Sequence, residues 1–232
     1  MNEIVSQVRL DNARNESYGR ANGILGLIYI PALLALVVAI ILPKDSDFGS
    51  YLFGGFCSGL AMATAVYAIW PFLMTEQMGD QRLDGLVPIN RVHQVIGRYI
   101  TAALVVVAFV VGLLTMPAIF AIFALSVDVS VPGVLGVSAL FVLLVSDMLL
   151  PFLYKFSGVA VFKYMMFAIL GILVLALLVS RIHVDWLAVL NSIVDFLSAS
   201  TVRTVLLGVL VAVVATAISM ACSLHIYTHK DI

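Results

Sequence analysis

The sequence predicts an all-α, polytopic membrane protein with six transmembrane helices, and three observations lead to that class. Of its 232 residues, 63% are hydrophobic and only 11% are charged, which is more apolar surface than a soluble domain of this length could bury. Six segments are each apolar over the roughly 20 residues that a helix needs to cross the hydrocarbon layer. Lysine and arginine gather on one side of the resulting topology. A net charge of −1 gives no reason to expect nucleic acid as a partner.

A polar segment, residues 1–21, comes first. It carries acidic and basic side chains and has no cleavable apolar core, so we expect the first span to insert uncleaved. Ile4, Val5 and Val8 would share one side of a helix, with charges elsewhere. The segment is therefore either a solvated tail or an interfacial helix on the inner leaflet, and the sequence leaves both interpretations open.

Six apolar segments then form a transmembrane domain over residues 22–227. The third is long enough to tilt or to be broken at Pro117. Pro31, Pro71 and Pro151 lie inside or near the ends of other spans, where neighbouring helices can pair the carbonyl groups that a proline leaves free. The expected spans are residues 22–42, 52–74, 99–126, 134–154, 164–181 and 203–227.

The distribution of lysine and arginine predicts the orientation. Nine of these residues lie on the side of both chain ends and three lie on the other side, so the first side is cytosolic by the positive-inside rule. We expect a protein of the cell membrane whose cytosolic side holds both termini, including the tail 228–232, and the connection 75–98. The nine are Arg9, Arg14, Arg20, Arg82, Arg91, Arg98, Lys155, Lys163 and Lys230; the three are Lys44, Arg181 and Arg203.

A second amphipathic stretch lies on the outer side, at residues 184–199. Trp186, Leu190, Ile193 and Leu197 fall on one helical stripe, with polar residues opposite. The stretch is too short and too polar to cross the membrane. We expect a helix that lies on the outer leaflet or dips into it.

Motifs for covalent chemistry are missing from the sequence. It has no phosphate-binding loop, no nucleophile elbow and no zinc-protease motif, so it predicts no catalytic site, metal or cofactor in this chain. Cys57 and Cys222 lie on opposite sides of the bilayer in the predicted topology. We therefore expect no disulfide between them and interpret both as small buried hydrophobes. His225 and His229 are one helical turn apart, without a convincing set of metal ligands.

Two features inside the spans have a structural and a functional interpretation. Asp147 is the one acidic side chain well inside a span, where a carboxylate by default suggests function. Near the cytosolic end of its span it can also reach water or fix helix packing. Gly55 and Gly59 form a GxxxG pair, which gives weak support for a dimer face.

The longest polar interruption, residues 75–98, connects the second and third spans. Asn90 can cap a short helix, because its side-chain oxygen accepts a hydrogen bond from a free N–H group of the first turn. Val92 and Val95 then begin an apolar face that runs into the third span. A rigid element tied to a membrane helix suits docking by a partner, and an ordinary interfacial turn is the alternative.

Together with two other stretches, this connection resembles the type-two ABC exporter permeases. In that family an acidic residue after the second span precedes a Leu-Pro-x-Ser/Asn-Arg turn and a basic-Tyr start to the third span. Here Val87 separates Leu86 from Pro88, where the family usually has Leu-Pro directly. The resembling stretches are Glu76 with Leu86-Val87-Pro88-Ile89-Asn90-Arg91 and Val95-Ile96-Gly97-Arg98-Tyr99, then residues 150–156, and the ending from Ser219 to Ile232.

The resemblance implies a permease that pairs with a second permease, the same or a paralogue, and with two cytosolic ABC ATPase subunits. The partner would bind ATP and Mg, so the chain would not itself be an enzyme. Ile89–Ile96 would be a short cytosolic coupling helix, braced by the N-terminal segment, and 184–199 an extracellular helix between the fifth and sixth spans. The residues implied in coupling are Leu86, Pro88, Ile89, Asn90, Arg91, Val92 and Val95, with Glu76, Asp147 and Arg98 as further polar residues of interest.

The resemblance also suggests a cargo. Nearest in size and motif are small permeases that export, or confer resistance to, amphipathic peptides such as cytolytic or antimicrobial ones. By that analogy the substrate is an amphipathic or antimicrobial peptide or another hydrophobic compound. Two alternatives stay open: an ion-coupled secondary transporter that uses Asp147, and a non-transporting immunity or assembly membrane protein.

Overall fold

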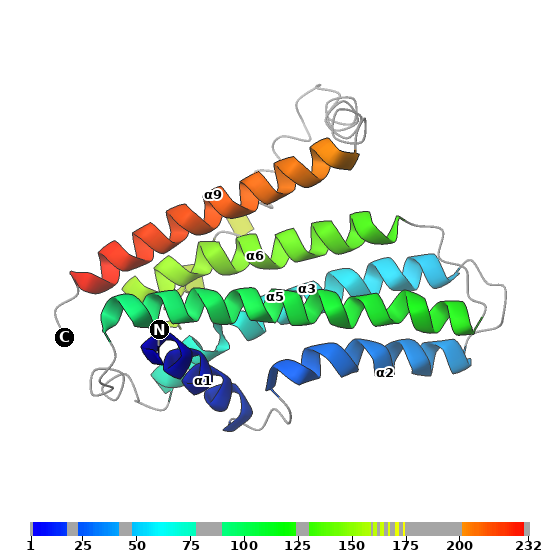
Figure 1. Cartoon of the computed structure of the whole chain (residues 1–232), viewed down its shortest axis with the longest axis horizontal. Helices are drawn as coiled ribbons and strands as arrows, with labels where there is room; N and C mark the ends of the chain where they lie inside the picture. Colours follow the sequence, from blue (N-terminus) through cyan, green and yellow to red (C-terminus); the bar gives the residue numbers. More distant parts are fainter. Residues whose placement is uncertain are drawn as a thin grey trace.

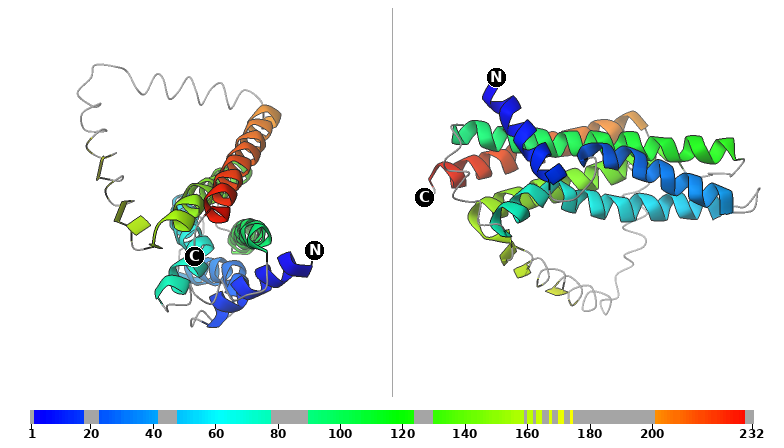
Figure 2. Two further views of the ribbon diagram at one scale, coloured as in Figure 1. Left: turned by 90° about the vertical axis from the view of Figure 1, so that its left-hand side faces the viewer. Right: turned by 90° about the horizontal axis from the view of Figure 1, so that it is seen from below.

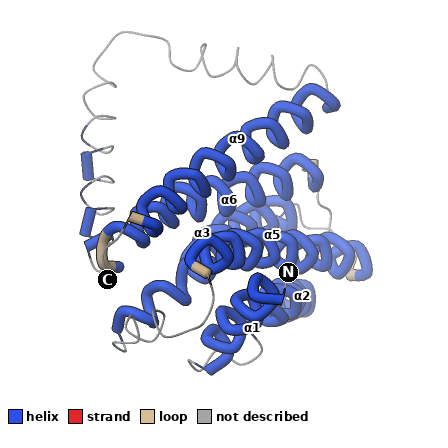
Figure 3. The backbone as a smooth tube through the Cα atoms, turned by 60° about the vertical axis from the view of Figure 1, so that its left-hand side comes forward, coloured by secondary structure: helices blue, strands red, loops and turns tan. Residues whose placement is uncertain are grey.

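The computed structural model describes residues 2–17, 23–41, 48–77, 90–123, 130–158 and 201–229, with single positions from 160 to 174. These residues form helices and short loops without a strand, which confirms the expected all-α class (Figure 3). The helices are α1 Asn2–Ser17, α2 Gly26–Ile41 after the 3₁₀ turn η1 Gly23–Leu25, α3 Phe48–Gln77, α5 Arg91–Ile122, α6 Val131–Lys155 and α9 Thr201–Thr228.

Helix α5 is the shared helix of the bundle. It runs alongside α2, α3 and α6 and also contacts α1 and α9, whereas α1 lies obliquely across one end (Figures 1 and 2). That end holds α1, the start of α5 and the ends of α6 and α9. The first and last helices of the chain therefore meet at one end of the bundle, as the predicted topology requires.

Four described helices are long and apolar enough to cross a membrane: Tyr51–Trp70, Arg91–Ile122, Val131–Lys155 and Arg203–Thr228. They correspond to the second, third, fourth and sixth expected spans. The first expected span is a shorter apolar helix, α2, of 16 residues. Most of the fifth, and all of the outer stretch 184–199, lie outside the described residues. The count of six spans stays a prediction.

The expected short helix over Ile89–Ile96 needs a correction. Its described part is the cap and first turns of α5, which runs unbroken for 32 residues and passes through Pro117. Asn90 does act as a cap: its Oδ1 accepts a hydrogen bond from the Val92 N–H at 3.0 Å. No proline or second cap follows before the third span, so nothing separates the two pieces. Residues 78–89 lie outside the described part of the chain.

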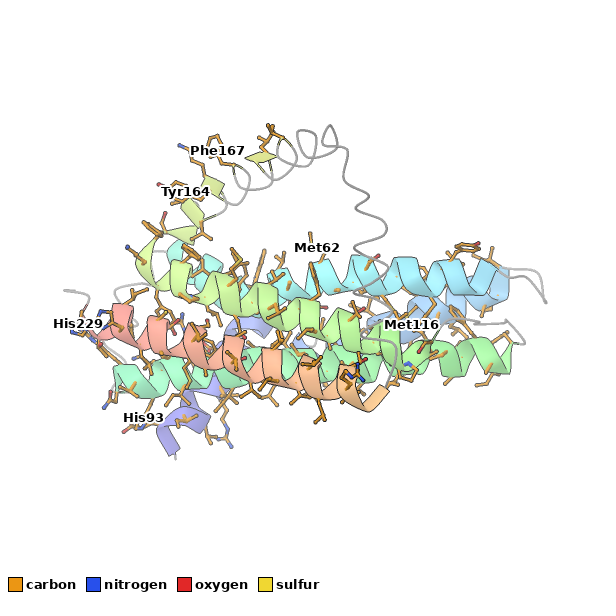
Figure 4. The ribbon with its side chains drawn as sticks, turned by 90° about the horizontal axis from the view of Figure 1, so that it is seen from above. Met62, His93, Met116, Tyr164, Phe167 and His229 are labelled. Atoms are coloured by element: carbon orange, nitrogen blue, oxygen red, sulfur yellow. The ribbon has the colours of Figure 1, made fainter. Side chains whose placement is uncertain are left out.

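The main apolar core fills the middle of the bundle between α2, α3, α5 and α6. Phe53, Phe109, Met116 and Phe120 are almost completely buried there. Outward-facing side chains are also apolar, as for Met62 on α3, which is 58% exposed (Figure 4). Apolar side chains on both the inner and outer faces are expected for a bundle whose solvent is lipid.

Helices α2 and α5 approach each other most closely at Gly112. A side-chain carbon added there would clash with the Leu27 carbonyl oxygen and lie 3.1 Å from the Ile28 Cα. Pro31 has no N–H to donate to the Leu27 carbonyl, which lies four residues earlier in the helix. Glycine lets the α5 backbone reach this carbonyl, so the α2–α5 contact depends on the missing side chain.

The GxxxG pair of α3 makes no such contact within the chain. A side-chain carbon at Gly55 or Gly59 would meet nothing within 4 Å. The use of this pair in a dimer face stays a prediction.

We predict that Gly112→Ala separates α2 from α5 and destabilises the fold. Overpacking of this kind costs about 1–3 kcal/mol, which lowers the melting temperature by roughly 2–4 °C per kcal/mol for a chain of this size. Thermal unfolding followed by a thiol-reactive dye at the buried Cys57, with Cys222→Ser in the background, measures this. Gly136→Ala, which meets nothing within 4 Å, is the control. Equal melting temperatures of the two variants would contradict the close approach of α2 and α5 at Gly112.

Candidate functional site

The candidate site is the end of the bundle where α1, α5, α6 and α9 meet. We call it the polar end, and define it by α1, Asn90–Tyr99 of α5, Asp147–Tyr154 of α6 and Thr216–Tyr227 of α9. Most of the described hydrogen bonds between helices lie here. Figure 4 shows His93, near the start of α5, and His229, just beyond α9, at this same end.

The start of α5 is capped twice. Asn90 accepts from the Val92 N–H, and Glu3 of α1 accepts from the Asn90 N–H at 3.3 Å. Glu3 Oε2 also lies 2.6 Å from His93 Nδ1. A carboxylate at a helix N-terminus is favourable because the first N–H groups lack partners within the helix. The hydrogen bond from His93, followed by that from Asn90, lowers the pKa of Glu3 below its ordinary value of 4.5.

Helix α1 packs on α5 through polar side chains. A side-chain carbon at Gly97 would lie 2.7 Å from Gln7 Cγ, so glycine allows the close crossing. Gln7 and Asp11 are both buried, and Gln7 Nε2 donates to Asp11 Oδ1 at 2.9 Å. Val5 is instead 46% exposed. The sequence allows either a solvated tail or an interfacial helix for this segment. The structure shows a helix that faces α5 with polar groups, and its place on the inner leaflet stays a prediction.

Tyr227 connects α9 to the first turns of α5. Its hydroxyl donates to Gln94 Oε1 at 2.8 Å, and its carbonyl accepts from Arg91 Nη1 at 3.5 Å. The Arg91 guanidinium carbon lies 5.9 Å from the centre of the Tyr227 ring. The centres of the Tyr227 and Tyr154 rings are 5.0 Å apart. One residue near the end of α9 therefore contacts both α5 and α6.

A chain of hydroxyl groups connects the same helices about two turns deeper. Ser219 Oγ donates to the backbone carbonyl of Asp147, which Pro151 cannot reach with an N–H of its own. Tyr99 Oη lies 2.5 Å from Ser219 Oγ and 2.9 Å from Ser223 Oγ. The single Ser219 proton is already used, so Tyr99 donates to Ser219 and Ser223 donates to Tyr99.

Asp147 itself is nearly buried, with 5% of its surface exposed. Its Oδ2 accepts a hydrogen bond from the Thr216 hydroxyl at 2.6 Å. Both its side chain and its backbone carbonyl thus bind α9. This is the geometry that a packing role requires, and the choice between packing and ion coupling stays a prediction.

The structure separates the predicted coupling residues into two groups. Asn90 and Val92 are exposed and accessible to a partner, and Arg91 is half-buried against Tyr227. Val95 is completely buried among the side chains of the polar end, so it faces the chain's own interior. Arg98 is also buried, 5.9 Å from the Tyr154 ring. Leu86, Pro88 and Ile89, and the side chain of Glu76, lie outside the described part.

Sequence reasoning missed the contacts that Tyr227, Tyr99 and Glu3 make. The spacing of Ser219, Ser223 and Tyr227 places three hydroxyl groups on one face of the last span, and that pattern could have revealed a polar contact there. Glu3 carries no comparable signal, because its partners lie 87 and 90 residues away.

The structure also describes the two cysteines and the histidine pair near the end of α9. Cys57 is buried as expected, but the expectation that Cys222 is buried is wrong, because it is exposed on α9; both thiols are free. The rings of His225 and His229 are tilted by 45° to each other, with their centres 4.5 Å apart. Among the described residues, no three histidine, cysteine or acidic side chains are placed to hold a metal ion.

Comparison with known proteins gives one match. A family model described as ABC-2 family transporter protein matches residues 23–228, from η1 to the end of α9. Neither the curated proteins nor the solved structures gave a match to the chain.

We predict that Ser219→Ala loosens α9 from α6, because the Asp147 carbonyl then loses its partner in an apolar medium. Hydrogen bonds between membrane helices contribute about 0.6 kcal/mol on average and up to roughly 1.7 kcal/mol. Unfolding in sodium dodecyl sulfate followed by circular dichroism measures the loss. Ser58→Ala is the matched control, since its exposed hydroxyl bonds only to Gly55 of its own helix. Equal stability of both variants would contradict a stabilising role for the hydrogen bond between Ser219 and the Asp147 carbonyl.

We predict that the first turn of α1 loosens from α5 in acid. The lowered pKa means that the Glu3 contribution is complete above pH 4.5 and is lost as the pH falls below that value. A spin label at Val5→Cys, with Cys57→Ala and Cys222→Ser, reports the mobility of α1. The label should become more mobile as the pH falls below 4.5, and Glu3→Gln should abolish this step. A step that survives in Glu3→Gln would assign the titration to another group.

Proposed function

This chain belongs to the ABC-2 family of transporter proteins, and we propose that it is the permease subunit of an ATP-driven exporter. In this proposal it forms the translocation path with a second permease, the same or a paralogue. Separate cytosolic ATPase subunits bind ATP and Mg and supply the energy. The chain lies in the cell membrane with both termini in the cytosol, consistent with nine of its twelve lysines and arginines on that side.

The observation that carries the proposal is the position of the start of α5. It directly follows the connection 78–89, and its cap Asn90 is exposed at the polar end. A force applied there enters the one helix that contacts α1, α2, α3, α6 and α9. Displacement by a cytosolic partner would therefore reach every described helix of the chain directly.

Helix α1 has a supporting role in this proposal. Glu3 accepts from the Asn90 N–H and pairs with His93, so α1 holds the first turn of α5 from the side. Close packing of Gln7 against Gly97 places the crossing a further turn along α5. We infer that α1 braces the coupling segment against the load that the ATPase applies.

The proposed substrate is an amphipathic peptide, such as an antimicrobial peptide, or another hydrophobic compound. Support comes from the resemblance in size and motifs to small peptide-exporting permeases. It also comes from the scarcity of charge within the spans, which suits a cargo that moves along apolar surfaces.

We predict that Arg91→Glu and Ile89→Asp each lower permease-stimulated ATP hydrolysis about tenfold or more, within the usual range of coupling energies. Both should leave the chain folded, since a carboxylate near a helix N-terminus does not oppose the helix. The measurement is ATP hydrolysis by the complex that copurifies with the chain in lipid nanodiscs.

Arg203→Glu is the matched control, because Arg203 is an exposed first-turn arginine of α9 at the opposite end of the bundle. Full stimulation of ATP hydrolysis in both Arg91→Glu and Ile89→Asp would argue against coupling through this segment. Transport by the isolated chain under an ion gradient, without any ATPase, would favour the ion-coupled alternative.

A further inference from the structure

The contacts between α5 and α9 form an antiparallel ladder. Near the start of α5, Gln94 bonds to Tyr227, and about one turn further along Tyr99 bonds to Ser223 and Ser219. Contacts further along α5 therefore involve earlier residues of α9, and the α9 residues are four positions apart. The rungs on α9 lie on one face, at four-residue spacing, so the ladder defines which face of α9 is turned toward α5.

The ladder also ends on a group that requires a partner. Its last hydroxyl, Ser219, donates to the Asp147 carbonyl, which Pro151 leaves without a helical donor. Sliding α9 by one turn so that Ala215 takes the place of Ser219 would leave this carbonyl unpaired within the span. Unpaired polar groups are costly there because no water is present to replace the lost partner.

The contacts of α9 with the rest of the chain are concentrated at the polar end. Within the described part of the chain, Val205, Leu206, Val209 and Leu210 near its start are 56–64% exposed, whereas Ser223 is completely buried. Figures 1 and 3 show α9 close to α6 at the polar end and further away toward its start. The polar rungs lie at the end where Met220 and Leu224 also pack against buried apolar side chains, so this end locates the helix.

We propose that the last third of α9, Thr216–Tyr227, is part of the coupling element and moves with α5 as one body. This inference rests on the proposed function. Tyr99 and Tyr227 are its positioning residues: their hydroxyl groups transfer a displacement of the α5 start to α9, at the end where α9 also packs against buried apolar side chains. At the polar end the ATPase then displaces α5 directly, and α9 moves because it is bound to α5.

The first measurement tests the ladder on the whole chain in lipid nanodiscs. Spin labels at the native Cys222 of α9 and at Ile100→Cys of α5, with Cys57→Ala, report the α5–α9 distance; both labelled positions are exposed. We expect one narrow distance distribution in this chain. Tyr99→Phe with Tyr227→Phe should broaden it, and Ser223→Ala should broaden it less. Tyr164→Phe, an exposed tyrosine away from the bundle, should leave it unchanged (Figure 4).

The second measurement uses the complex with the ATPase that copurifies. The label distance should be the same without nucleotide and with ATP trapped by vanadate. Stimulated ATP hydrolysis should fall about threefold in Tyr227→Phe, about tenfold in Tyr99→Phe and about twentyfold in the double variant, as expected for one, two and three lost interhelical hydrogen bonds. The amount of ATPase that copurifies should not change.

Two results would overturn the inference: a label distance that changes with nucleotide in the otherwise unaltered chain, or a double variant that keeps both the narrow distribution and full stimulation. Failure of the proposed function gives a different result. In that case Arg91→Glu and Ile89→Asp stay fully stimulated, or no ATPase copurifies, while the isolated chain still shows the effect of the double variant on the distance. Coupling through the ladder would then be rejected together with the proposed function.

Discussion

The structure depends on one constraint: a polar group within a membrane span must find its partner inside the protein. Prolines make the constraint acute, because each one leaves a carbonyl of its own helix without a donor. Pro151 leaves the Asp147 carbonyl free, and Ser219 of α9 binds it. Pro31 leaves the Leu27 carbonyl free, and Gly112 lets the α5 backbone come up to it. Two of the main contacts between helices thus lie where a proline has removed a hydrogen bond.

Hydrogen bonds between the described helices are concentrated at one end of the bundle. The main apolar core joins α2, α3, α5 and α6, and a second apolar cluster lies at the polar end. At the polar end, hydrogen bonds join α1, α5, α6 and α9 with defined partners. Hydrogen bonds depend on distance and angle, so this end resists relative rotation of its helices. In the proposed function this end receives the force from the ATPase, where such stiffness is needed.

Helix α1 illustrates how this end differs from a simple amphipathic arrangement. Its buried side chains, Gln7 and Asp11, are polar, and Val5 is exposed. The residues that match the transporter family begin after α1, yet Glu3 supplies an acceptor at the N-terminus of α5. Glu3 and the α5 start that it contacts are far apart in sequence and adjacent in space.

The sequence by itself determined the all-α class, four of the spans, the Asn90 cap and the resemblance to a transporter family, because these depend on local composition, spacing and short motifs. It also indicated that the carbonyls freed by proline need partners. Only the tertiary structure decided which partners they have, that α5 runs unbroken from its cap, and that Val95 faces inward while Cys222 is exposed. Apolar residues dominate every face of these helices, so hydropathy alone does not specify rotation or register. Those are decided by contacts such as Tyr227 with Gln94, whose residues are 133 positions apart.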